Sequence, residues 1–183
     1  MTPSFAVLVV VTLLRQAAAH GTHEHGHHHH DHDHDEHAAH DHDHAAGLHD
    51  HHEVMPLSAK EYEAMVANDK HVWAVKFYSG MCGACKSFKP AFMDAHKTVD
   101  GLHWAAIDID NKSNIGLAKR MGVLDEGIPN VKLVNVQETP LSIVAGDTPS
   151  ATDFAKKLTD TLATSGAKKD DAGFYLSRSR AEL

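Results

Sequence analysis

The chain has very little cysteine: Cys82 and Cys85 are the only two in its 183 residues. Because no third cysteine exists, neither a framework of structural disulfides nor a zinc site made of two cysteine pairs can form. The chain also lacks an excess of positive charge, since its formal net charge is −8 and its sequence pI is about 6.1. It therefore has no basic surface of the kind that nucleic-acid binding requires.

Long apolar runs are missing as well. The run from Phe5 to Leu14 has about ten residues, whereas a membrane-spanning helix needs roughly 20. Small residues follow at Ala17 to Ala19, so residues 1–19 are predicted to be a secretory signal peptide, with no stable membrane insertion after its cleavage. Because Arg15 interrupts this pattern, an uncleaved anchor or a misread start is the alternative.

Histidine is concentrated in one segment, with 16 of the 19 between His20 and His52. Residues 20–53 also contain nine Asp or Glu and no Lys or Arg, which predicts a disordered segment. Its dense imidazoles favour zinc or another divalent transition metal; a pH-dependent tether and a solvated linker are the alternatives. The candidate ligands are His27, His28, His29, His30, His32 and His34. The other histidines, expected to be ordinary domain residues, are His71, His96 and His103.

From residue 54 to residue 164, apolar blocks alternate with turn signals, which predicts one α/β domain with a central mixed sheet flanked by helices. Ser58 and Glu61 form a capping box for the first helix. The predicted strands are Val72 to Tyr78, Leu102 to Ile109, Val131 to Val136 and Leu141 to Val144, the last two as an antiparallel hairpin. The other predicted helices are Gly83 to Val99, Ile115 to Met121 and a last one from Ser150 through Leu162.

The composition becomes polar again after the domain, and residues 165–183 are predicted to form a flexible tail. The tail ends in RAEL, Arg180 to Leu183, which shares the final Glu-Leu of the endoplasmic-reticulum retention tetrapeptide but has Ala where that signal has Asp. Together with the signal peptide, this ending predicts the lumen of the endoplasmic reticulum. Secretion is the alternative.

The cysteine pair follows a predicted strand and stands at the start of the next helix. Residues at i and i+3 lie on one face of a helix, close enough for a disulfide. The free N–H groups and the dipole of the helix favour an anion at its first turn. Cys82 is therefore the predicted nucleophile and Cys85 the predicted resolving thiol.

The run VWAVKFYSGMCGACKSFKPAF, Val72 to Phe92, resembles the thioredoxin superfamily and, within it, the catalytic domains of protein disulfide isomerases. The resemblance continues through AAIDID, Ala105 to Asp110, and MGVLDEGIPNVKLV, Met121 to Val134, and covers residues 54–164. It implies a thioredoxin-like fold and a thiol–disulfide oxidoreductase that works through the CGAC pair without an organic cofactor. Disulfide-containing or thiol-containing proteins are the implied partners.

The resemblance also implies a substrate groove. Pro129 would be a cis-proline facing the cysteines, and the backbone of Ile128 would pair with an extended substrate segment by strand addition. Met81 stands where the family usually has Trp, and it is predicted to offer substrates a flexible apolar contact.

Three other positions depart from the family pattern. Lys76 replaces a buried acid that relays protons to the resolving thiol; it either acts as a base or favours a thiolate, or it extends to the surface without a role. Gly83 and Ala84 leave no histidine between the cysteines, which predicts a less oxidising pair than in disulfide isomerases. Leu124 to Glu126 are expected to lengthen the loop before the proline.

Two other functions remain open at this point. One is a zinc-binding protein whose thiols are ligands released by oxidation. The other is an adaptor that captures client proteins in the cis-proline groove with slow redox turnover. The oligomeric state is not predicted by any of these patterns.

Overall fold

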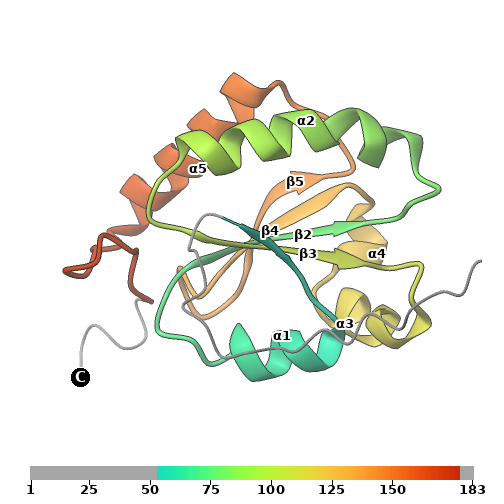
Figure 1. The fold of residues 1–183 in the computed structure, drawn as a ribbon, viewed down its shortest axis with the longest axis horizontal. Helices are drawn as coiled ribbons and strands as arrows, with labels where there is room; N and C mark the ends of the chain where they lie inside the picture. The colour runs from blue at the N-terminus through green and yellow to red at the C-terminus, as the bar shows by residue number, and fades with distance from the viewer. Residues whose placement is uncertain (1–52, 178–183) are drawn as a thin grey trace, which may run out of the picture. The chain divides into compact units, whose positions relative to one another are not determined.

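The computed structural model describes residues 53–177, which form a five-stranded mixed sheet with helices on both faces (Figure 1). The strand order is β1-β3-β2-β4-β5. β1, β2 and β3 are parallel, whereas β4 pairs antiparallel with both β2 and β5. The strands are β1 (Val54–Pro56), β2 (Trp73–Tyr78), β3 (His103–Asp108), β4 (Asn130–Val134) and β5 (Leu141–Ala145).

Two hydrophobic cores form, one on each face of the sheet. The longer helices α2 and α5 cover one face, and α1 and α3 lie on the other (Figure 1). Phe92 and Phe154 fill the first core, and Tyr62 and Leu117 contribute to the second. The helices are α1 (Ala59–Met65), α2 (Gly83–Thr98), α3 (Ile115–Arg120), α4 (Val123–Glu126) and α5 (Ala151–Ser165).

Local sequence signals set where these helices begin. At α1, the Ser58 side chain accepts the N–H of Glu61 while the Glu61 carboxylate accepts the N–H of Ser58, so the predicted capping box is confirmed. Ser150 caps α5 through the N–H of Asp153. The predicted α/β architecture, with its antiparallel hairpin of β4 and β5, is confirmed.

Two local features differ from the sequence-based expectation. Strand β1 was not predicted as a strand, because three residues are too short to show a period; its register pairs Val54 with Trp104 on β3. Leu124 to Glu126 do not lengthen a loop but belong to the short helix α4, which Gly122 opens with a φ of 74°.

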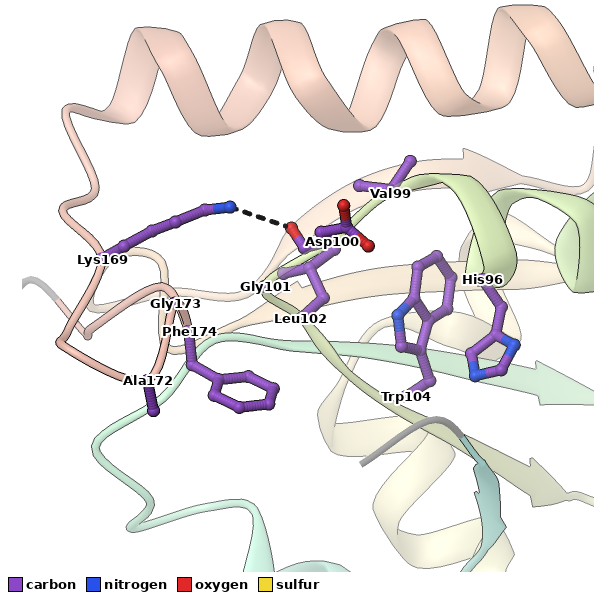
Figure 2. A pocket seen from close by; sticks show the side chains of 10 residues that line it. All are labelled: His96, Val99, Asp100, Gly101, Leu102, Trp104, Lys169, Ala172, Gly173 and Phe174. Carbon is purple, nitrogen blue, oxygen red and sulfur yellow. Dashed lines mark hydrogen bonds between the residues drawn. The ribbon is translucent and has the colours of Figure 1, made fainter. Parts of the chain in front are cut away.

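The segment after α5 is packed, and the prediction of a flexible tail from residue 165 is wrong for its described part, up to Ser177. Its backbone joins the starts of β2 and β3: the N–H of Val72 donates to Tyr175 (2.8 Å), and the N–H of Tyr175 donates to Gly101 (2.8 Å). Figure 2 shows Lys169 reaching the carbonyl of Asp100 at 3.5 Å. The composition of this segment did not predict its packing, because the segment is attached to the domain by backbone hydrogen bonds rather than by a long apolar run.

Other sequence predictions concern residues that the structure does not describe. The signal peptide (1–19), the histidine segment up to His52 and the RAEL ending lie outside residues 53–177. Among the described residues, no helix combines the length and apolar character that crossing a membrane would take.

The packed segment should contribute to stability through Tyr175, whose ring packs against the core of α2 and α5. We expect Tyr175→Ala to lower the free energy of unfolding by about 1–3 kcal/mol, because a partly buried aromatic contact is lost. Urea denaturation measures this change. Glu138→Ala, at an exposed site between β4 and β5, is the control and should stay within about 0.5 kcal/mol of the parent. An equally small effect for Tyr175→Ala would contradict the stabilising role.

Candidate functional site

Cys82 and Cys85 lie at the start of α2 and are joined as a disulfide, with their Cα atoms 5.2 Å apart. Cys82 is half-buried, whereas Cys85 lies a turn further along the helix and is 5% exposed. A disulfide is opened when a thiolate attacks whichever of its two sulfur atoms is accessible. The geometry therefore leaves Cys82 as the sulfur that a substrate can approach and Cys85 as the protected partner.

Cys82 is also the N-cap residue of a 16-residue helix. Its Sγ accepts the backbone N–H of Cys85 at 3.0 Å. Unpaired N–H groups and the helix dipole give the first turn of a helix a partial positive charge. When the disulfide is reduced, the same position favours a negative charge on the Cys82 sulfur.

The peptide bond between Ile128 and Pro129 is cis, as the family resemblance implied, and it lies beside the cysteine pair. The Cys82 Sγ is 3.8 Å from the Ile128 carbonyl oxygen. The antiparallel pairing of β2 with β4 places Phe77 opposite Asn130, so the residue before β4 meets the residues after β2. Met81 is 84% exposed next to this site, where an incoming chain can contact it.

Lys76 lies on β2 and is 7% exposed, so its side chain is buried and does not extend to the surface. Its Nζ lies over the rings of Phe92, at 4.4 Å from the centroid, and Tyr78, at 5.1 Å. Within residues 53–177, no carboxylate lies at ion-pair distance from it. Burial, with a smaller contribution from the charge of Lys89, lowers the pKa of Lys76 from 10.5 to about 8.

A pocket of about 420 Å³ lies between this lysine and Cys85. Lys76 and Cys85 both line it, and Lys86 and Lys89 add two further cations from α2. Glu53, the first described residue, lies at the same pocket. The pocket gives solvent a route to the buried sulfur and to the buried amine.

Comparisons with known proteins agree with this geometry. The family model for thioredoxin matches residues 53–160, which is more than half of the chain. The chain belongs to the thioredoxin family.

Relatives of this thioredoxin domain include protein disulfide-isomerase A6 from Homo sapiens and Mus musculus, each 30% identical over 103 residues. These residues are 54% of this chain and 22% of each relative, so the chain spans about a fifth of their length. A Caenorhabditis elegans homolog of protein disulfide-isomerase A6 is 27% identical over 82 residues, 44% of this chain and 18% of the relative. The J-Trx1 fragment of ERdj5 has the same fold, with a TM-score of 0.51 and 22% identity over 60% of this chain and 52% of that structure.

Asp110 holds the loop between β2 and the cysteines, and sequence reasoning did not identify this role. Its Oδ1 accepts the Ser79 hydroxyl at 2.8 Å, and its Oδ2 accepts the N–H of Gly80 at 2.8 Å. The Ser79 Oγ in turn accepts the N–H of Met81 at 3.1 Å. The sequence did contain a signal for this contact. Ser79 and Asp110 follow two predicted strands, and polar residues after neighbouring parallel strands meet at one edge of the sheet.

An ion pair between the buried Lys132 and the more exposed Glu126 lies on the other side of the thioredoxin site, between α4 and β4. The Lys132 Nζ lies 2.7 Å from Glu126 Oε1, and the Lys132 side chain is 3% exposed. Asn130 and Ser142 also donate to the Glu126 carboxylate, at 3.0 Å and 2.8 Å. Burial raises the pKa of Glu126, but these hydrogen bonds and Lys132 together lower it below its usual value. The pair links α4 to β4 and so fixes both ends of the cis-proline turn.

The candidate metal ligands His27 to His34 lie outside the described residues, and their role stays a prediction. The catalytic roles of Cys82, Cys85 and Lys76 also stay predictions, although the structure brings the three residues to one site.

Replacing Lys76 by Met should remove the cost of burying an ammonium group. Because the pKa of Lys76 falls from 10.5 to about 8 on folding, this cost is fully present below pH 8 and is relieved as pH rises toward 10.5. The parent should gain stability relative to Lys76→Met in this window, by up to about 3 kcal/mol at roughly 1.4 kcal/mol per pKa unit. Denaturant unfolding of both chains at pH 7 and pH 10 measures the change, with Lys157→Met, at an exposed site on α5, as the control. A difference that stays constant across the window would contradict the assignment.

Proposed function

We propose that this protein is a thiol–disulfide oxidoreductase that acts on protein substrates of the secretory pathway. The observation that carries the proposal is the Cys82–Cys85 disulfide at the start of α2, with the cis Ile128–Pro129 peptide beside it. The similarity to proteins named disulfide isomerases supports the same reaction class.

The exchange reaction proceeds through a mixed disulfide. The Cys82 thiolate attacks one sulfur of a substrate disulfide, forms a Cys82–substrate bond and releases the other substrate sulfur as a thiolate. Cys85 then loses its proton and attacks the Cys82 sulfur, which closes the Cys82–Cys85 disulfide and releases the second substrate thiolate. Both steps are reversible, so the same pair can donate a disulfide to a reduced substrate.

Extended polypeptide fits the surroundings of Cys82 better than a compact small molecule. The Ile128 carbonyl lies 3.8 Å from the Cys82 sulfur, so a chain joined to Cys82 would lie against the backbone that leads into β4. Main-chain pairing binds many sequences with similar strength, because it makes few demands on side chains. Exposed Met81 adds an apolar contact that adapts to different side chains.

Lys76 serves in this proposal as the proton acceptor and donor for Cys85. Both groups line one pocket, and the lysine pKa of about 8 is close to the roughly 8.5 of a free thiol. A proton therefore passes between the two groups, through the solvent of the pocket, with little change in free energy in either direction.

The secretory pathway is proposed from the sequence of residues 1–19 and the RAEL ending. Disulfides persist in that oxidising environment, where a disulfide donor or isomerase has substrates.

Removing the resolving thiol should trap the intermediate. When reduced Cys85→Ser protein is mixed with a disulfide-bonded secreted protein, we expect a covalent complex through Cys82, because nothing can displace the substrate from within. Non-reducing electrophoresis and mass spectrometry of the cross-linked peptide measure it. Cys82→Ser is the matched control and should trap no complex through Cys85, which is 5% exposed. Equal trapping by both variants, or by neither, would count against the proposal.

Proton transfer by Lys76 can be distinguished experimentally from the effect of a positive charge in the pocket. At neutral pH, Lys76→Met should slow closure of the Cys82–Cys85 disulfide from the mixed disulfide by about 10-fold or more, because proton transfer from Cys85 loses its partner. The pH–rate profile of this step should also lose its inflection near pH 8. Rapid-quench trapping of the mixed disulfide measures the rate. Lys89→Met removes a cation from the same pocket and should keep the inflection; identical profiles for the parent and Lys76→Met would exclude the role.

A further inference from the structure

A second group of reactive side chains lies at the other end of the sheet from the cysteine pair. His71 lies two residues before β2, and His103 begins β3, whereas Cys82 follows the carboxyl end of β2. Asp69 lies in the same group. Each of the three residues offers one potential ligand atom, and these three atoms lie within 4.8 Å of one another. All three side chains are partly buried. No sequence pattern groups these residues, because 32 positions separate the two histidines along the chain.

We propose that Asp69, His71 and His103 form a zinc-binding site. Imidazole nitrogens and a carboxylate oxygen are ligands that zinc accepts, and three protein ligands leave a fourth position for solvent. This site is separate from the predicted ligands of the histidine segment, and it does not depend on the proposed redox function.

The spacing inside the cluster suits a metal better than a direct hydrogen bond. His71 Nδ1 and Asp69 Oδ1 are 3.5 Å apart. A nitrogen–oxygen hydrogen bond is usually about 2.7–3.2 Å long. Two ligands at about 2.0–2.1 Å from a tetrahedral zinc ion are separated by about 3.4 Å, so this pair needs almost no movement to bind one ion.

The outer partners of a metal site are also in place. His71 Nε2 lies 3.0 Å from Asp170 Oδ2, an arrangement that directs Nδ1 toward the cluster. The second oxygen of Asp69 accepts the indole N–H of Trp73 at 2.7 Å, which leaves its other oxygen facing His71. Metal-binding histidines commonly donate their second nitrogen to a carboxylate, and binding carboxylates are themselves hydrogen-bonded. The two carboxylates also match the charge of a divalent cation.

Aromatic packing fixes the third ligand. The ring of His103 stacks on Phe174 at 4.5 Å with an angle of 2° between the planes, and it lies 4.8 Å from the Trp73 ring. The His71 ring is 5.1 Å from the His103 ring. Phe174 and Asp170 both belong to the packed C-terminal segment, which Figure 2 shows with Phe174 beside β3. The site is therefore complete only when this segment is in place.

Trp73 provides a local reporter in the oxidised 183-residue chain, in which the many histidines of residues 20–52 are predicted to bind metal as well. The chain has only two tryptophans, so the indole N–H signal of Trp73 can be followed by NMR. A chelator buffer sets the free zinc concentration whatever the histidine segment binds. We expect zinc to shift the Trp73 signal saturably, because its acceptor Asp69 becomes a ligand.

Variants identify the ligands. His103→Ala should abolish the saturable shift, and Asp170→Asn should weaken the apparent zinc affinity by about 10-fold to 100-fold, because the partner of His71 is lost. His96→Ala, a domain histidine outside the cluster, is the matched control and should keep the parent response. The proposal is overturned if the parent Trp73 signal fails to respond at free zinc concentrations that saturate the histidine segment. It is also overturned if His96→Ala and His103→Ala lose the response equally. If a variant fails to fold, the titration of the parent still tests the site, because the absence of a Trp73 response in the parent is enough to overturn the proposal.

Discussion

The antiparallel pairing of β4 with the central strand β2 is the constraint on which the redox site depends. Because Phe77 lies opposite Asn130, the chain that leaves β2 toward Cys82 meets the chain that enters β4 from Pro129. The two halves of the site come from distant parts of the sequence, and the sheet register alone brings them together. Asp110 on the β3 side and Glu126 on the β4 side then hold the two turns in place.

Two lysines are buried in this small domain, and their surroundings give them opposite properties. Lys132 is matched by the Glu126 carboxylate, so its charge is neutralised where it stands. Lys76 has aromatic rings around its amine, and among the described residues no acid pairs with it. A buried lysine with a carboxylate partner is a structural anchor, whereas a desolvated amine without one exchanges its proton near pH 8.

Much of the fold was readable from the sequence because local signals and periodicity agreed. The capping box at Ser58 and the apolar run before Cys82 identified α1 and β2 within a residue or two. The cis peptide at Pro129 could be expected only from the family resemblance, since no local pattern predicts it. The grouping of Asp69 with His103 and the docking of Tyr175 depend on which strands become neighbours, and composition carries no information about that.

The way the C-terminal segment closes the domain has a consequence for biosynthesis. Tyr175 supplies the carbonyl that Val72 needs at the start of the central strand, so pairing at this point waits for a segment that is translated after α5. Until the residues around Tyr175 have left the ribosome, the edge where β2 and β3 begin stays open to water and to other chains. Completion of the domain thus waits for the segment after α5, and a nascent chain would need protection at that edge longer than at the cysteine pair.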